Sequence, residues 1–331
     1  MPTPPSPSRA MTQCARRGGF RVARRVALKV RPAILIAAFI VAAATAGAQP
    51  LSTREWLIAG RLTQGGIVFG TAPPGTVRVT VDGAPVRLTG DRRFLAGFGR
   101  DAPPEATLVA TLADGSREVR VVPVARRHYD IESIPSLRQP PPDAPPDPVY
   151  DARRAVELAA IRDARAGDSD ALGWTEAFAW PAHGRISGVY GSQRILGGVP
   201  KAPHLGVDVA APPGAPVTAP AGGVIRLAHG PFLLEGNLVM LDHGHGLVSA
   251  FLHLSRIDVK EGQHVVCGDR LGLVGMTGRA TGPHLHWALS WRTARLDPAL
   301  FVPEGGTNQR GGGYFTAAPI ALTLLTNADA I

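Results

Sequence analysis

Glycine-containing turns recur every few residues between Trp180 and Pro303, and the apolar segments between them are too short to be helices. Residues 238–241, 247–251 and 271–274 are apolar runs of this kind. Short strands bounded by glycine turns are typical of compact antiparallel β-structure. This stretch therefore predicts an antiparallel β-sheet or sandwich built from many short strands. Because positive φ alone explains glycine in such turns, no single glycine here is evidence of function.

A second β-rich region precedes this one. Val77, Val79 and Val81 alternate with polar residues, and the turn dipeptide Asp82-Gly83 follows them. Alternation with period two, ended by Asp-Gly, indicates a β-hairpin. We expect residues 49–128 to form a small β-sandwich, and the whole chain to be mainly β. The sequence leaves three roles open for this sandwich: a spacer, a targeting module or a lid over the second domain.

Residues 129–175 are expected to form a proline-rich linker followed by one helix. Six prolines lie between Pro140 and Pro148, which favours extended backbone. Asp147 can cap a helix that begins at Pro148, and good helix formers continue to Arg165. We expect this helix to pack between the two β-domains.

The first 48 residues have the composition of a signal peptide. Eight basic residues and no acidic ones precede an apolar run from Ala33 to Ala46, and Ala46-Gly47-Ala48 is a small-residue cleavage pattern. A bilayer span needs roughly 20 apolar residues, so we expect no stable membrane span after signal removal, with an uncleaved anchor as the alternative. Arg24-Arg25 also fits a twin-arginine signal, which leaves the export route open. The predicted location is the periplasm, or outside the cell if the protein is secreted.

The charge balance argues against a nucleic-acid partner. The chain has 35 basic and 26 acidic residues, but eight of the basic ones lie in the predicted signal. Residues 49–331 are therefore nearly neutral overall, whereas nucleic-acid binding requires a basic surface. The oligomeric state is left open. Residues 304–331, which include three consecutive glycines, are expected to be loosely ordered.

Nine of the ten histidines lie between His183 and His286. His204 and Asp208 are an even number of residues apart, as are His284 and His286. On a strand, the two side chains of each pair would therefore point to the same face. Three of these four side chains could hold a metal and leave one position for water, which is the pattern of catalytic zinc sites. Nitrogen and carboxylate ligands also suit other divalent metals.

Three segments, in order, resemble the motifs of a known family. His204-Leu205-Gly206-Val207-Asp208 resembles H-x-G-x-D, Phe251-Leu252-His253-Leu254-Ser255 resembles Y-x-H-L-S, and Gly282-Pro283-His284-Leu285-His286 matches G-P-H-L-H. These are motifs of the lysostaphin/LytM-type zinc metallopeptidases, and the resemblance covers roughly Trp180 to Val302. It implies a metallopeptidase domain over residues 176–303.

The resemblance also implies residue roles and a reaction. His204, Asp208 and His286 would bind one Zn²⁺ per chain, while His253 and His284 would be catalytic without binding the metal. The chain would then be an exported endopeptidase that hydrolyses peptide cross-links of peptidoglycan, with the stem peptides as substrate. The alternative is a non-catalytic or latent module that regulates cell-wall amidases, as in relatives that have lost zinc ligands. All five positions are filled here, which favours the enzyme.

The other conspicuous side chains in this region have structural interpretations. His243 and His245 flank Gly244 in a predicted hairpin turn, where we expect turn or surface roles. The family often has an aromatic hydroxyl at the position of Phe251, and we interpret Phe251 as a packing residue. We expect Trp287 to lie in the core or to form a groove wall.

Overall fold

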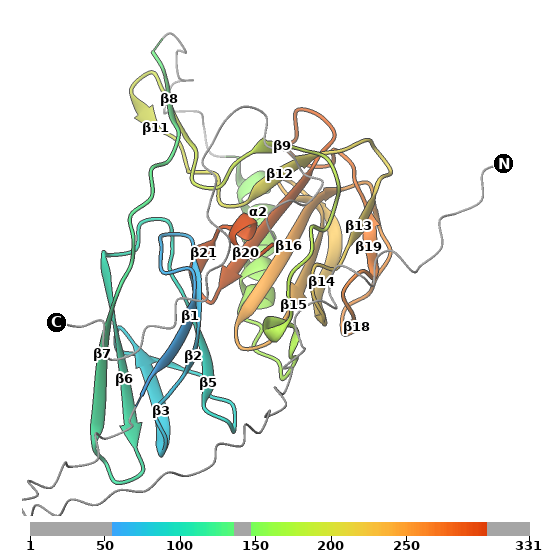
Figure 1. The fold of residues 1–331 in the computed structure, drawn as a ribbon. Coiled ribbons are helices and arrows are strands. Elements are labelled where there is room, and N and C mark those ends of the chain that lie inside the picture. Colours follow the sequence, from blue (N-terminus) through green and yellow to red (C-terminus); the bar gives the residue numbers. More distant parts are fainter. Residues whose placement is uncertain (1–54, 136–146, 303–331) are drawn as a thin grey trace, which may run out of the picture.

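The computed structural model describes residues 55–135 and 147–302. The predicted signal peptide and the predicted glycine-rich tail lie outside the described residues. The described part is mainly β with one α-helix, which confirms the predicted fold class (Figure 1). Within it, no helix combines the length and the apolar character that crossing a membrane requires.

The N-terminal β-unit, residues 55–125, consists of two antiparallel sheets over a common apolar core. One sheet has the order β1-β2-β5 and the other β4-β3-β6-β7. Phe94 and Leu108, one from each sheet, are fully buried in this core. The strands are β1 (Leu57–Gly60), β2 (Ile67–Thr71), β3 (Thr76–Val81), β4 (Ala84–Val86), β5 (Arg93–Gly97), β6 (Glu105–Leu112) and β7 (Arg117–Pro123).

The predicted hairpin is present, but its alternation is broken at one residue. Asp82 and Gly83 both adopt positive φ between β3 and β4, as a tight hairpin turn requires. Val79 and Val81 are buried, whereas Val77 is 63% exposed. The pairing of β3 with β6 shifts register between Thr76 and Arg78. Because such an irregularity inserts an extra residue, it turns Val77 away from the core.

The C-terminal region is built around one large antiparallel sheet, here called the central sheet. Its order is β18-β14-β15-β16-β20-β12-β9, and β21 pairs with β20. A second sheet has the order β13-β19-β17. The strands are β9 (Arg185–Gly188), β12 (Val207–Ala210), β13 (Pro216–Thr218), β14 (Gly223–Phe232), β15 (Gly236–Asp242), β16 (Leu247–Leu254), β17 (Arg256–Ile257), β18 (His264–Val265), β19 (Arg270–Leu273), β20 (Leu285–Trp291) and β21 (Ala294–Leu296).

The two faces of the central sheet pack against different partners. Leu241, Phe251 and Trp287 belong to the same core cluster as the N-terminal β-unit. Met240 and Ala288 point to the opposite face and belong to a second cluster, which includes residues of helix α2 (Pro148–Arg165). We call this second face the α2 face. Alternation along β20 places His286 on it as well.

Helix α2 begins as predicted. The Asp147 side chain accepts hydrogen bonds from the backbone N–H groups of Val149 and Tyr150, both at 3.1 Å. Such a cap satisfies two N–H groups that have no partner within the helix. Ile161 and Ala164 on the opposite half of the helix are buried against the central sheet.

The expected position of the helix between the two β-domains was wrong. Glu157 is buried at its middle, where it accepts hydrogen bonds from Arg153, Arg154 and the backbone N–H of Leu233. Arg154 also pairs with Glu235, at the turn between β14 and β15. These interactions fix α2 on the α2 face of the central sheet, where it contacts β14 and β15.

The N-terminal β-unit packs directly on the C-terminal region, with β5 next to β20 and β21 (Figure 1). Phe69 stacks on Trp174 with ring centroids 6.3 Å apart, and Arg127 pairs with the buried Asp297 at 2.8 Å. One continuous core cluster contains residues of both parts. The N-terminal β-unit is therefore not a spacer that stands apart.

A further strand lies in the stretch predicted as a linker. β8 (Ile131–Ile134) pairs in parallel with β10 (Gln193–Leu196), which also pairs with β11 (Val199–Pro200). In Figure 1 these strands extend above the N-terminal β-unit. The loop that follows β11 contains the first histidine of the motifs, His204.

Candidate metal centre

Two neighbouring strands bring the first and last motifs together. β12 pairs with β20 so that Asp208 lies directly opposite His286. His204 precedes β12, and its backbone is fixed by hydrogen bonds from Gly191 N–H to His204 O at 2.7 Å and from His204 N–H to Ser192 O at 2.8 Å. His286 therefore meets His204 and Asp208 at one point, although it lies 78 residues after Asp208 in the sequence.

Three potential ligand atoms converge at this point. Asp208 Oδ1 lies 2.8 Å from His286 Nδ1 and 3.1 Å from His204 Nε2, and the two nitrogens are 3.0 Å apart. Zinc bonds of roughly 2.0–2.2 Å in a tetrahedron would place such atoms about 3.3–3.6 Å apart. The triangle therefore needs to widen by only a few tenths of an ångström to hold this ion. The three side chains keep 15–25% of their surface exposed, so water can reach them.

The hydrogen bond on the far side of His204 fixes which of its nitrogens can bind a cation. His204 Nδ1 lies 3.1 Å from Val189 O, and a carbonyl can only accept. Nδ1 therefore carries the hydrogen, and Nε2 directs its lone pair at the Asp208 carboxylate. Because both atoms are then acceptors, a proton or a cation has to lie between them. This donor set fits a divalent metal.

Two glycines leave the space that the ligands occupy. A Cβ on Gly206 would lie 2.7 Å from His286 Nε2, and one on Gly188 would lie 2.3 Å from Asp208 Oδ2. Both distances are far shorter than ordinary van der Waals contact. The sequence reading assigned no function to any glycine, yet these two residues shape the site. Gly206 occupies the glycine position of the H-x-G-x-D pattern, which was the available signal.

His253 and His284 lie beside the triangle, with ring centroids 4.8 Å apart. His253 Nδ1 is 2.9 Å from Thr277 O, and His284 Nδ1 is 2.8 Å from Gly282 O. Because each carbonyl only accepts, each Nδ1 carries a hydrogen and each Nε2 is left with a lone pair. His284 Nε2 lies 3.8 Å from Asp208 Oδ1, which places it next to the triangle without a hydrogen bond to it.

The backbone of His253 adopts a left-handed conformation, with φ at +64°. For a residue with a Cβ such a conformation costs of order 1–3 kcal/mol, so the surroundings have to hold it. The N–H of His253 donates to Glu235 O, and Thr277 Oγ1 donates to Leu254 O next along the chain. Thr277 lies outside the three motifs and was not among the predicted site residues. Thr277 positions His253 in two ways: the Thr277 carbonyl oxygen contacts the His253 ring, and the Thr277 hydroxyl holds the backbone of the next residue, Leu254.

The environment sets opposite protonation tendencies within the site. Burial lowers the pKa of His253 and of His286, so both favour the neutral form. Burial also acts to lower the pKa of His204, but the hydrogen bond to Asp208, the charge of Asp208 and the hydrogen bond to Val189 O together outweigh it, so the pKa of His204 is raised. The same contacts with His204 and His286 hold the pKa of Asp208 well below its usual range despite its burial. The carboxylate is therefore ionised and keeps its negative charge for a cation.

His243 and His245 lie in the expected turn, and of the two predicted roles, turn or surface, the turn holds because both side chains are buried. His243 is fully buried in the turn, where its Nδ1 lies 2.8 Å from Gly222 O and its Nε2 2.8 Å from Ser249 Oγ. Trp287 Nε1 donates to the same Ser249 oxygen at 3.3 Å. Burial lowers the pKa of His243 to about 4. His243 is thus a neutral core histidine whose polar atoms are satisfied, and the expected turn position is confirmed.

Phe251 and Trp287 are both fully buried in the core, which confirms the packing interpretation of each. Tyr190, in the segment before the first motif, is buried as well and donates a hydrogen bond to Arg295 O at 2.7 Å.

Comparison with known proteins gives partial matches to curated sequences. The model of peptidase family M23 matches residues 202–298. The peptidoglycan DD-endopeptidase ShyA of Vibrio cholerae is 48% identical over 89 residues, which are 27% of this chain and 20% of ShyA. The cell division protein DipM of Caulobacter vibrioides is 36% identical over 133 residues, 38% of this chain and 21% of DipM. The chain thus spans about a fifth of the length of these relatives.

A solved structure is matched over most of its own length. A crystal structure described as a peptidase M23 from Pseudomonas aeruginosa superposes with a TM-score of 0.55 and 31% sequence identity, and the match covers 73% of this chain and 95% of that one. This coverage extends well beyond the motifs. Since the identity, the coverage and the M23 family match agree, the chain belongs to peptidase family M23.

Proposed function

We propose that this protein is an exported, zinc-dependent endopeptidase that hydrolyses peptide cross-links of peptidoglycan in the periplasm. The observation that carries the proposal is the convergence of His204, Asp208 and His286, whose ligand atoms lie 2.8–3.1 Å from one another. In this proposal the three side chains hold one Zn²⁺. The 15–25% exposure of these side chains leaves a side of the site open to a water and a substrate carbonyl.

The remaining two histidines supply proton transfer. A bound zinc ion would polarise the scissile carbonyl and lower the pKa of water towards 7. His253 and His284 each keep an unprotonated Nε2, because each Nδ1 donates to a carbonyl, and His284 Nε2 lies 3.8 Å from Asp208 Oδ1. Either can accept the proton of the attacking water and return it to the leaving amine. The lowered pKa of His253, caused mainly by burial, keeps it in the accepting form at neutral pH.

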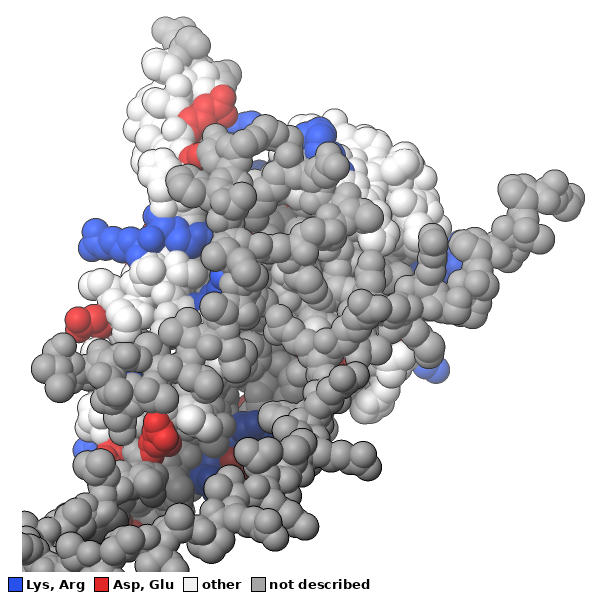
Figure 2. All heavy atoms as spheres, viewed as in Figure 1, with Lys and Arg blue, Asp and Glu red and all other residues white. Residues whose placement is uncertain are grey.

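The substrate class is proposed from the relatives. ShyA, a peptidoglycan DD-endopeptidase, shares 48% identity with this chain over 89 residues. The apolar run and small-residue pattern of residues 33–48 support export to the compartment where peptidoglycan lies. On the face drawn in Figure 2, the visible basic and acidic side chains form small separate groups, in keeping with a proposal that includes no nucleic-acid partner.

The test measures metal content and reaction product on the same protein. Purified protein is expected to bind about one zinc per chain and to release soluble muropeptides from isolated sacculi, with mass spectrometry identifying the bond that is cut. His204→Ala should abolish both, because it removes one of three ligands. His264→Ala, which changes an exposed histidine on β18, should change neither.

A second candidate is a module that regulates cell-wall amidases without hydrolysing peptidoglycan. The similarity to DipM, a cell division protein, is the observation that favours it. The five filled positions favour the enzyme, since a module without catalysis would not need His253 and His284 beside an intact triangle. Stoichiometric zinc without any hydrolysis of sacculi would support this second candidate instead.

A further inference from the structure

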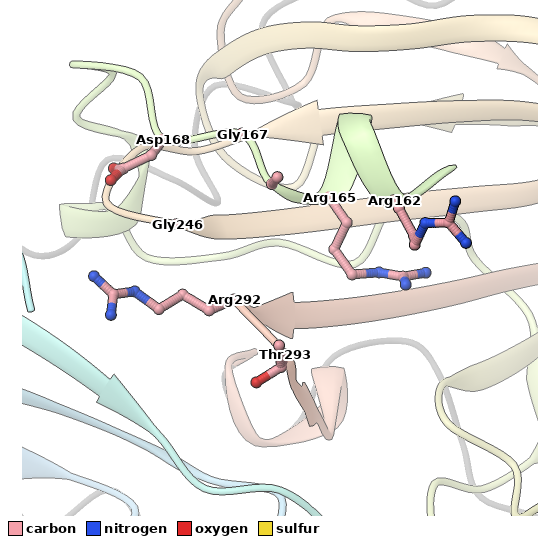
Figure 3. Close-up of a pocket in the computed structure, with 8 residues that line it drawn as sticks. Arg162, Arg165, Gly167, Asp168, Gly246, Arg292 and Thr293 are labelled. Carbon is pink, nitrogen blue, oxygen red and sulfur yellow. The ribbon is translucent and has the colours of Figure 1, made fainter. Parts of the chain in front are cut away.

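A cavity of about 580 Å³ lies at the C-terminal end of α2, on the central sheet but away from the candidate metal centre. Figure 3 shows Arg162 and Arg165 projecting from the last turn of α2 on one side of the cavity, while Arg292, which follows β20, points its guanidinium group the other way, towards the side of Asp168. Arg292 follows β20 six residues after His286, a separation of roughly 20 Å along an extended chain. The cavity is therefore distinct from the metal centre.

Among the described residues, two of the guanidinium groups near this cavity have a buried nitrogen without a hydrogen-bond partner. Arg165 Nε is buried and, in the part of the chain that the structure describes, has no hydrogen-bond partner. The same is true of Arg295 Nε, on the neighbouring strand β21. Burial and, to a lesser degree, the positive charge of Arg165 lower the pKa of Arg295 to about 10. Two arginines thus lie close enough to repel one another, in a region partly removed from water.

The nearby carboxylates are already engaged. Asp168 lines the cavity but pairs with Arg87 of the N-terminal β-unit at 3.1 Å. Asp242 lies behind Gly167 and accepts hydrogen bonds from the backbone N–H groups of Ser169 and Gly244. Neither carboxylate is directed at Arg165. Burial lowers the pKa of Arg165, and the negative charge of Glu235 offsets only part of this effect.

The end of the helix explains only part of this cluster. Cations in the last turn of a helix are favoured by the unpaired carbonyls there, which accounts for Arg162 and Arg165 as residue types. It does not account for Arg295, which comes from β21, and it does not satisfy the two buried Nε atoms. Arg292, by contrast, already donates a hydrogen bond to Pro85 O. A negatively charged group in the cavity would supply a partner for Arg165 and offset the repulsion between Arg165 and Arg295.

We propose that the cavity at the end of α2 binds an oxyanion, either a carboxylate or a phosphate, at the side lined by Arg162 and Arg165. Guanidinium groups recognise both through paired, charge-assisted hydrogen bonds. The volume of about 580 Å³ admits a small organic anion as well as an inorganic ion. The proposal does not depend on the proposed hydrolysis, because it concerns other residues and needs no metal.

Calorimetric titration of the full protein with two probes tests the proposal. The probes are inorganic phosphate and the dipeptide N-acetyl-alanyl-alanine, the latter also as its C-terminal amide. Wild-type protein is expected to bind at least one of the two anions and not the amide. Arg165→Gln should weaken binding at least about tenfold, because a hydrogen bond to a charged group is lost. Arg226→Gln, which removes an exposed charge from β14, should change the affinity less than twofold.

The relative affinity of the two anions identifies the source of the ligand. Tighter binding of the dipeptide indicates a peptide carboxylate, and tighter binding of phosphate indicates a phosphate group. If Arg165→Gln does not fold, as judged by its thermal unfolding, the exposed Arg162→Gln replaces it. Absence of binding of both anions, or the same affinity in wild type and in the folded arginine variant, would overturn the proposal.

Discussion

Replacing Gly206 with alanine tests whether the close packing around His286 controls metal binding. The added Cβ would lie 2.7 Å from His286 Nε2 and 2.7 Å from Trp287 O. Ordinary contacts begin near 3.4 Å, so the imidazole has to retreat by about 0.7 Å. Metal–ligand distances tolerate only about 0.2 Å. Because the backbone oxygen on β20 cannot yield easily, we expect the ring to move and zinc affinity to fall about 10- to 100-fold, as for other changes beside a ligand.

Competition against a chromophoric zinc chelator measures this affinity without any activity assay. The matched control is Gly282→Ala, in the G-P-H-L-H motif, where an added Cβ meets nothing within 4 Å. This variant should bind zinc within about twofold of wild type. Thermal unfolding of both metal-free variants separates a general loss of stability, about 1–3 kcal/mol for overpacking, from the local effect. Unchanged zinc affinity in folded Gly206→Ala would refute the reasoning.

Three other predictions concern single side chains. His286→Ala should lose zinc, whereas His284→Ala should keep zinc and lose turnover, as measured by metal analysis and sacculus digestion; equal zinc loss in both would contradict the assigned roles. His243 has a folded-state pKa of about 4, below the unfolded value near 6.5. Its contribution to stability is therefore present above pH 6.5 and is lost as the pH falls to about 4, a difference of about 3 kcal/mol. Denaturant unfolding across this range should show a flatter pH dependence for His243→Asn, and an unchanged one for the exposed His264→Asn. Asp147→Ala should destabilise the protein by about 1 kcal/mol in the same assay, because it removes two hydrogen bonds at the start of α2; no change would mean that the cap contributes nothing.

Local signals in the sequence predicted local structure well. The turn at Asp82-Gly83 and the cap at Asp147 are present because each depends on residues within a few positions of itself. The alternation of Val79 and Val81 also placed both residues inside. Val77 is exposed, unlike Val79 and Val81. The register shift that exposes it arises in the pairing with β6, and the sequence of β3 alone does not reveal that shift.

Long-range placement was harder to predict. The position of α2 on the central sheet depends on Glu157 and on the pair formed by Arg154 and Glu235, and none of these residues carries a sequence motif. His243 appeared to be a polar turn residue, but the structure buries it with two partners from other strands. The residues of the candidate metal centre could be predicted only because they lie in motifs that resemble those of a known family. The space left by Gly206 emerged from the fold.

The parallel pairing of β8 with β10 has a consequence for anyone who shortens this protein. A fragment that begins after the linker would lose β8, and one edge of β10 would then present unpaired backbone N–H and C=O groups. Exposed strand edges promote pairing between molecules. Such a fragment is expected to self-associate through Gln193–Leu196. The smaller share of monomers would then lower any activity that is measured, although the residues of the candidate metal centre had not been changed.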